Sequence, residues 1–240
     1  MVIGLTNEAR GLVDKFVADT KATHPIVIEG SDSAQTFGIS GFPSSFLIDA
    51  DGKVAWSGHP GNLTPELIEA QLKNVRLVPQ LPAKLSAAQA LLDKRKFGDA
   101  RKLLEKAAAD EKASDEDRKA ATDAVAWLDD NAQRHMKSAA EDAAKDPFSA
   151  SEAYSDLAEQ YKGTETASAA EKALKDLLSD PAVKKEIDCT RKFADVKARI
   201  RDLKPKKAIP IVKGFLSGAK GTKVATQAEE LLRTLEAADK

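Results

Sequence analysis

Cysteine is almost absent from this 240-residue chain, in which Cys189 is the only one. A single cysteine excludes an internal disulfide, a Cys-x-x-Cys redox pair and a zinc or iron–sulfur site built from cysteines. Histidine is scarce too, and His24, His59 and His135 show no metal-ligand spacing. We therefore predict no metal, no cofactor and no catalytic residue in this chain.

Aromatic residues make up only 5% of the sequence, and no apolar run reaches the length of about 18 residues that a membrane span needs. We expect no membrane-spanning helix and see no signal peptide at Met1. Charged residues at 31% and apolar residues at 42% suit a folded protein rather than a disordered one. The net charge of −1 singles out no partner.

The stretch between residues 37 and 54 carries the most informative pattern. Ser44 to Ile48 ends in three contiguous apolar residues, which predicts a strand buried on both faces. Asp49 to Gly52 is a turn that offers a glycine for positive φ, and Lys53 to Ser57 alternates as a half-buried antiparallel strand does. Pro43 directly before a strand is unusual, because proline cannot donate to the ladder.

The flanking sequence extends this pattern. Val2 to Thr6 and Pro25 to Ile28 read as short apolar strands, and Asn7 to Lys21 as a helix between them. Ser31 to Phe37 reads as a short helix. After the second strand, Thr64 is placed to cap a helix that begins at Pro65, with Leu67, Ile68 and Leu72 as its apolar stripe.

In their order these elements resemble the second part of a thioredoxin-like domain of the bacterial TlpA type, from the redoxin family of thiol–disulfide oxidoreductases. The resemblance covers roughly residues 1–77. It implies a cis Phe42–Pro43 bond, where the residues alone favour an ordinary trans proline. It also implies that Phe42 and Pro43 bind substrate, with their backbone pairing to a bound peptide. Such relatives act in cell redox homeostasis and are typically periplasmic or membrane-anchored.

The departure from that family is as informative as the match. The family's Cys-x-x-Cys motif, with the strand and helix that carry it, has no counterpart here. We expect the sheet to lack the strand that lies between Val2–Thr6 and Ser44–Asp49. Either the chain is a truncated form of a longer protein, or an upstream segment or a partner strand completes the sheet; we favour truncation.

Residues 78–84 contain two prolines and read as a linker, and residues 85–240 read as helix throughout. Ser86 and Asp99 are placed to cap two short helices around a turn at Phe97–Gly98, which is typical of a tetratricopeptide-like hairpin. Ser114 to Lys145 then reads as one long helix or two stacked ones. Its candidate core residues are Val125, Trp127, Leu128 and Met136.

An internal repeat supports a helical-repeat architecture. Residues 162–177 align without gaps on residues 220–235, with eight of 16 positions identical and an offset of 58. In each copy Lys-Gly-Thr predicts a helix end at the glycine and a cap at the threonine. The offset suggests a hairpin plus a connecting helix. Candidate core residues are Ala167, Ala170, Leu174 and Leu177, facing Tyr154, Leu157 and Tyr161, and Ile211, Phe215 and Leu216 in the second copy.

Basic residues are concentrated between Lys184 and Lys223, a segment that contains 13 Lys and Arg but only four Asp and Glu. Such a stripe either binds nucleic acid or anionic lipid or forms a solvated helix face, and we expect the solvated face. Cys189, between charged residues, reads as a part-buried helix position rather than a reactive thiol.

The predicted fold class is therefore α/β plus all-α: an incomplete thioredoxin-like α/β domain (1–77), a Pro-rich linker (78–84) and a helical repeat domain (85–240). The predicted function is that of a thioredoxin-like protein related to thiol–disulfide oxidoreductases, redox-inactive in this form. The alternative is a non-catalytic scaffold that binds a protein partner through its helical repeats. Nucleic acid is not an expected partner.

Overall fold

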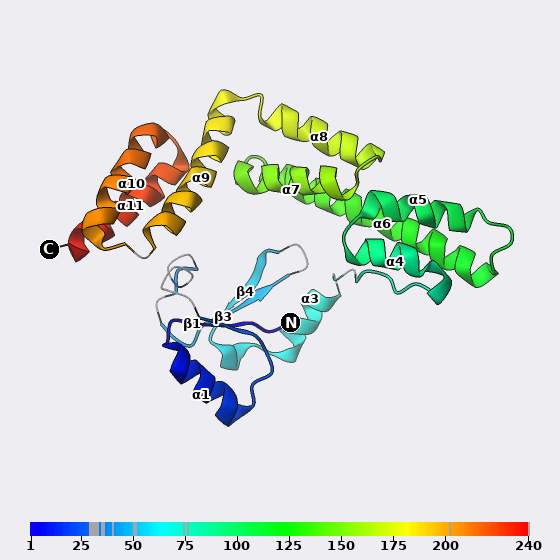
Figure 1. Cartoon of the computed structure of the whole chain (residues 1–240), viewed down its shortest axis with the longest axis horizontal. Helices are drawn as coiled ribbons and strands as arrows, with labels where there is room; N and C mark the ends of the chain where they lie inside the picture. Colours follow the sequence, from blue (N-terminus) through cyan, green and yellow to red (C-terminus); the bar gives the residue numbers. More distant parts are fainter. Residues whose placement is uncertain are drawn as a thin grey trace. The chain divides into compact units, whose positions relative to one another are not determined.

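The structure is a computed structural model, and it describes residues 1–28, 34, 37–39, 41–49, 52–73, 75, 77–201 and 203–239. It is predominantly helical, with two small sheets (Figure 1). The contacts divide the chain into two units, Met1–Val75 and Arg76–Lys240.

The first unit contains four short strands. β1 (Gly4–Thr6) pairs in parallel with β2 (Ile26–Ile28), and β3 (Ser45–Ile48) pairs antiparallel with β4 (Val54–Gly58). Among the described residues these pairs form separate two-stranded sheets. The strands thus follow the predicted order, and no described strand joins the two pairs.

Three helical segments complete the described part of this unit: α1 (Arg10–Thr20), η1 (Pro60–Asn62) and α3 (Pro65–Leu72). The Thr64 hydroxyl accepts the Leu67 N–H at 3.4 Å at the start of α3, as predicted. The expected helix from Ser31 to Phe37 lies largely outside the described residues.

The turn between β3 and β4 forms as predicted. Gly52 has a φ of +78°, a conformation that glycine adopts without steric cost. Its N–H donates to the Asp49 carbonyl at 3.2 Å, and the Asp49 side chain accepts the Lys53 N–H at 2.9 Å. This short-range chemistry fixes the hairpin independently of the rest of the unit.

Burial in the first unit is far lower than the sequence predicts. Among its described residues Val13 is the only buried hydrophobic side chain. Ile48 in β3 is 47% exposed, so the expectation of a strand buried on both faces is wrong. The apolar stripe of α3 is also open, with Leu72 58% exposed. The physical reason is that a two-stranded sheet has too little surface to build a core of its own.

The second unit consists of helices. A short turn, η2 (Ala83–Leu85), precedes eight α-helices in the described residues: α4 (Ser86–Asp93), α5 (Phe97–Ala108), α6 (Asp115–Asp142), α7 (Pro147–Gln160), α8 (Glu165–Leu177), α9 (Pro181–Ile200), α10 (Pro205–Ala219) and α11 (Lys223–Ala238).

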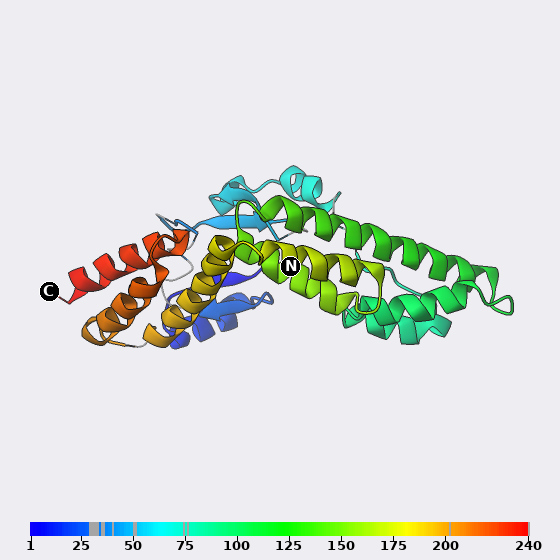
Figure 2. The same cartoon turned by 90° about the horizontal axis from the view of Figure 1, so that it is seen from above.

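These helices alternate between hairpins and single connecting helices. The hairpins are α4–α5, α7–α8 and α10–α11; α6 packs between the first two and α9 between the last two (Figures 1 and 2). The repeat is therefore a hairpin plus a connecting helix, as the 58-residue offset suggests. Pro147 and Pro205 begin equivalent helices, and Gly163 and Gly221 both have a φ of +81°.

Three local predictions about helix ends are wrong. Ser86 lies inside the first turn of α4 without a side-chain cap bond, and Asp99 lies inside α5, where it pairs with Lys102 at 3.2 Å. Phe97 and Gly98 begin α5 instead of forming a turn. Gly98 is there for close packing, because a Cβ would lie 2.2 Å from the Lys162 carbonyl oxygen.

The prediction that the Thr222 side chain caps α11 is wrong. Its hydroxyl donates to the Ala219 carbonyl at 2.6 Å. The Glu186 carboxylate from α9 instead accepts the Lys223 and Val224 N–H groups at 2.7 and 3.1 Å. The first copy behaves as predicted, since the Thr164 hydroxyl accepts the Ala167 N–H at 3.4 Å.

The residues predicted to form the core of the helical unit lie in its buried clusters or pack against them. Leu128 is fully buried, and Val125, Trp127 and Met136 pack against the same cluster. Tyr154, Leu157 and Tyr161 are buried, and Ile211, Phe215 and Leu216 pack in the cluster formed by α9 to α11. Val78 and Leu81 from the expected linker also pack against the helices, and the Leu81 N–H donates to Gln89 at 2.9 Å.

Candidate functional site

The loop before β3 presents the two predicted substrate-binding residues. The Phe42–Pro43 peptide bond is cis, as predicted. Phe42 is 72% exposed, and the Ser44 hydroxyl donates to the Gly41 carbonyl at 2.6 Å on the other side of the proline. Phe42 is thus accessible just before the start of a strand.

Each strand of the first unit pairs with another strand along one edge only. Its other edge has no strand partner among the described residues. The Gly4 N–H donates to the Pro25 carbonyl at 2.8 Å, which directs that residue toward β2. Because successive peptide groups alternate in direction along a parallel ladder, the N–H of Leu5 points to the opposite, free edge. By the same alternation the N–H of Ile28 points to the outer edge of β2.

Apolar residues are exposed on the same elements. The exposed large hydrophobic residues among those described lie mainly in the first unit. The twelve on and around α1, the strands and the cis-proline loop are Met1, Val2, Ile3, Leu5, Leu12, Phe16, Val27, Ile28, Phe37, Phe42, Ile48 and Val54. The β1 segment from Met1 to Asn7 carries no charged side chain. Free backbone groups next to uncharged apolar surface are typical of an edge that accepts another strand.

The cysteine and the histidine at position 59 do not form a second site. Cys189 is buried in α9, in the cluster that contains Phe193. His59 is used locally, since its Nδ1 accepts the Gly61 N–H at 3.1 Å. Across the described ranges no group of His, Cys, Asp or Glu side chains is arranged to hold a metal ion. No helix in these ranges is long and apolar enough to cross a membrane.

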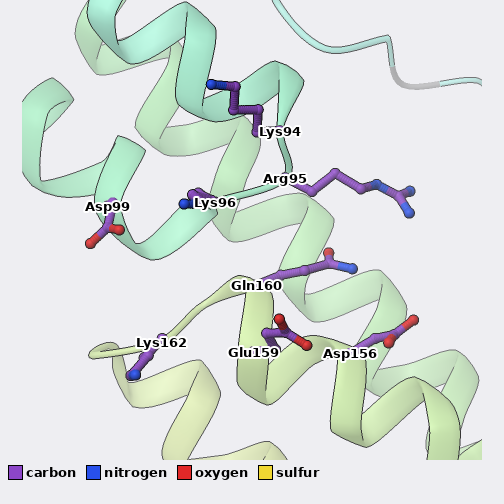
Figure 3. A pocket seen from close by; sticks show the side chains of 8 residues that line it. All are labelled: Lys94, Arg95, Lys96, Asp99, Asp156, Glu159, Gln160 and Lys162. Atoms are coloured by element: carbon purple, nitrogen blue, oxygen red, sulfur yellow. The ribbon is translucent and has the colours of Figure 1, made fainter.

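A hollow of about 530 Å³ lies in the helical unit, between the turn that joins α4 to α5 and the end of α7 (Figure 3). Lys94, Arg95 and Lys96 line it from the turn, and Asp156 and Glu159 from α7. In the described part of the chain none of these five side chains forms an ion pair with another. The hollow therefore offers cations and carboxylates that remain free to meet charges on a ligand.

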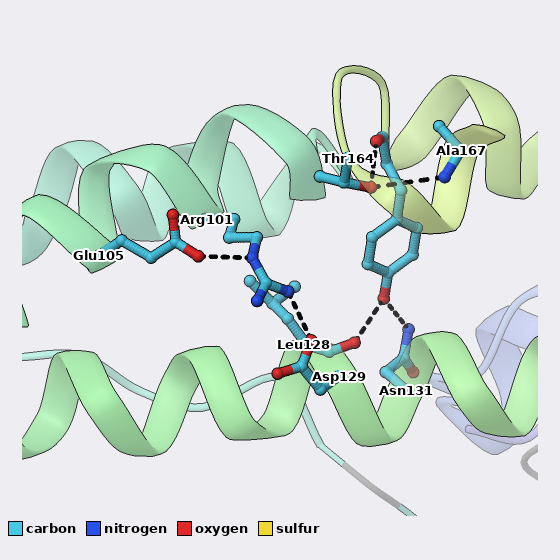
Figure 4. A network of polar contacts seen from close by, with 8 residues as sticks. Arg101, Glu105, Leu128, Asp129, Asn131, Thr164 and Ala167 are labelled. Atoms are coloured by element: carbon cyan, nitrogen blue, oxygen red, sulfur yellow. Dashed lines mark hydrogen bonds and ion pairs between the residues drawn. The ribbon is translucent and has the colours of Figure 1, made fainter. Parts of the chain in front are cut away.

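A buried polar network holds the helices that form this hollow (Figure 4). The Tyr161 hydroxyl donates to the Leu128 carbonyl at 3.0 Å and accepts from Asn131 at 2.9 Å. Burial raises the pKa of the Tyr161 hydroxyl, and the bond from Asn131 opposes this rise. Nearby, the Asp129 carboxylate accepts from Arg101 at 2.5 Å and raises the pKa of that guanidinium. Arg101, Asp129 and Asn131 could not be predicted from the sequence, because their contacts join distant segments.

No protein-family model, curated protein or solved structure matches the chain.

Proposed function

We propose that this chain is a thioredoxin-like protein, related to TlpA-type thiol–disulfide oxidoreductases, that works by binding protein segments rather than by redox chemistry of its own. Its first unit accepts an extended strand between β1 and β3, next to the cis-proline loop. Its helical unit is the scaffold that docks a protein partner.

The free edge of β1 is the observation that carries this proposal. The Leu5 N–H has no partner there among the described residues, and Leu5 is 50% exposed. A strand on this edge would satisfy backbone groups and cover the apolar side chains of the same elements. An occupant that lies in such a sheet is itself a continuous apolar run, because both of its faces become buried. It is supplied by a protein partner.

The order of elements supports the relation to thioredoxin-like proteins. The β1–α1–β2 segment is followed by the loop with the cis Phe42–Pro43 bond, the β3–β4 hairpin and α3. Within this arrangement Phe42 and Pro43 are the residues proposed to contact the bound segment. Phe42 lies in an exposed loop. The residue before it, Gly41, has no side chain that could cover its backbone.

This chain has no pair of thiols with which to carry out thiol–disulfide exchange of its own. Thiol–disulfide exchange requires an accessible thiolate and a second, resolving thiol. Cys189 is the only cysteine, and it is 7% exposed in the helical unit. An exchange reaction in which this protein takes part must therefore use cysteines from the bound segment or from another protein.

A scaffold role for the helical unit is favoured by the charged hollow. Lys94 to Lys96 on one side and Asp156 and Glu159 on the other keep their charges unpaired among the described residues. Charges of this kind confer orientation and specificity on a protein partner more than affinity.

Strand addition is tested by fluorescence anisotropy with a labelled peptide that has a central run of valine and isoleucine and charged flanks. A peptide of the same composition with proline in the run is the control, since it cannot pair. We expect Leu5→Pro, which removes the N–H on the free edge of β1, to abolish binding. Ile28→Pro, on the outer edge of β2, should leave binding unchanged. Equal binding of both peptides, or loss with Ile28→Pro alone, would contradict the proposal.

A further inference from the structure

The turn between α9 and α10 differs in charge from its counterpart in the preceding repeat. α6 ends at Asp142 and α7 begins at Pro147; 58 residues later α9 ends at Ile200 and α10 begins at Pro205. The two turns therefore have the same length and the same position in the repeat. Residues 141–149 hold three carboxylates and one lysine, whereas residues 199–207 hold five basic residues and one carboxylate.

The difference in sequence between the two turns leaves α10 without the side-chain cap that α7 has. Asp146 accepts the Ser149 N–H at 3.1 Å and the Ser149 hydroxyl at 2.7 Å, and so caps α7. The equivalent residues at the start of α10 are Lys204 and Lys207, and α10 has no side-chain cap. Lysines at this end also oppose the helix dipole. Since the same turn forms with Asp and Ser, the fold does not require lysines here.

The basic side chains of this turn have no partner among the described residues, in contrast to others in the same stripe. Arg191 pairs with Glu152 at 2.7 Å, and Lys213 pairs with Glu236 at 2.8 Å. The basic residues of the turn are all exposed, and their side chains have no ion pair or hydrogen bond with a described residue; they are Arg199, Arg201, Lys204, Lys206 and Lys207. Leu203, between them, is 36% exposed.

We propose that this turn binds the surface of an anionic lipid bilayer. Five cations within nine residues can reach a plane of phosphate headgroups together, and each contributes about fivefold to the partition coefficient. Leu203 adds an apolar side chain that enters the boundary between headgroups and acyl chains. No aromatic residue lies between residues 199 and 207, so the turn lacks the stacking surface typical of single-stranded nucleic-acid sites.

The preceding repeat supplies the test variant. Arg201→Ala, Lys204→Asp and Lys207→Ser introduce the residues found at the equivalent positions Ala143, Asp146 and Ser149. The control replaces four exposed lysines on other helices by glutamine, with the same change in net charge: Lys15, Lys106, Lys172 and Lys175. Sedimentation with vesicles of phosphatidylcholine and phosphatidylserine (7:3) is compared with phosphatidylcholine alone.

We expect the parent and control chains to bind the anionic vesicles. Binding should be weaker in 0.5 M than in 0.05 M NaCl, because the Debye length falls from about 14 Å to about 4 Å and the charges are screened. The turn variant should bind at least about 100-fold more weakly while its Tm is no lower, because it regains the helix cap. The proposal is overturned if the parent does not bind, if the control loses binding equally, or if a duplex DNA binds the turn more tightly than the vesicles do.

Discussion

The hydroxyl of Tyr161 accepts a hydrogen bond from the Asn131 side chain at 2.9 Å, and both residues are buried between α6 and the α7–α8 hairpin. The same hydroxyl donates to the Leu128 carbonyl at 3.0 Å. One phenol thus satisfies two polar groups in the interior of the helical unit, where unpaired groups are costly.

Removal of this hydroxyl should destabilise the helical unit. We expect Tyr161→Phe to lower the free energy of unfolding by about 1–3 kcal/mol, because it leaves Asn131 and the Leu128 carbonyl with a partner missing. Tyr154→Phe is the matched control, since Tyr154 is buried but its hydroxyl has no hydrogen bond to any described residue. Denaturant unfolding followed by circular dichroism measures both. Equal losses in the two variants would contradict a special role for the Tyr161 bonds.

The same tyrosine should make stability depend on alkaline pH. Burial raises the pKa of Tyr161 in the folded chain above its ordinary value of 10.0. The unfolded chain therefore loses this proton first, and the stability contribution, complete below pH 10, falls as pH rises toward the folded-state pKa. We expect the parent to lose more unfolding free energy than Tyr161→Phe between pH 9 and 11 (a range set about one unit either side of that value). Parallel curves for the two proteins would contradict this.

Close packing at Gly98 gives a third test. A Cβ at this position would lie 2.2 Å from the Lys162 carbonyl oxygen, so Gly98→Ala must push α5 away from the α7–α8 turn. We expect a loss of about 1–3 kcal/mol or more in thermal or denaturant unfolding. Gly214→Ala is the control, because Gly214 lies inside α10 with nothing within 4 Å of its Cβ position. That change should stabilise the chain by about 0.5–1 kcal/mol.

The glycines and helix caps of the structure show what the sequence can and cannot predict. Gly163, Gly52 and the Thr164 cap follow from chemistry within a few residues, and all three were predictable. The repeat was predictable because the same short pattern recurs. Gly98 and Glu186 were not, since each acts on a segment far along the chain that only the packed helices bring near.

The first unit illustrates a different limit. The apolar patterns of α1 and β3 correctly predict a helix and a strand, but Phe16 and Ile48 remain about half exposed, at 51% and 47%. An apolar pattern indicates which face is to be buried, whereas burial itself depends on a neighbouring element. The cis Phe42–Pro43 bond was predictable only through the family resemblance, because the residues alone favour trans.

The two units should differ in their ability to fold alone. We expect residues 76–240 to melt cooperatively, because the helices satisfy their backbones locally and share buried clusters. Residues 1–75 should show no cooperative melt, since Val13 is the one buried hydrophobic side chain among those described. Thermal melts of the two fragments by circular dichroism measure this. A cooperative transition in the shorter fragment would contradict the account of its open sheets.

Hydrogen exchange in the full chain, with and without the strand-forming peptide, tests strand addition most directly. The account predicts that the peptide slows exchange at the Leu5 amide and within Ser45–Ile48, and leaves β2, β4 and the helical unit unchanged. The proline-containing peptide should have no effect at either strand. Unchanged exchange at Leu5, or protection confined to the outer edges of β2 and β4, would contradict the proposal that a strand is taken up between β1 and β3.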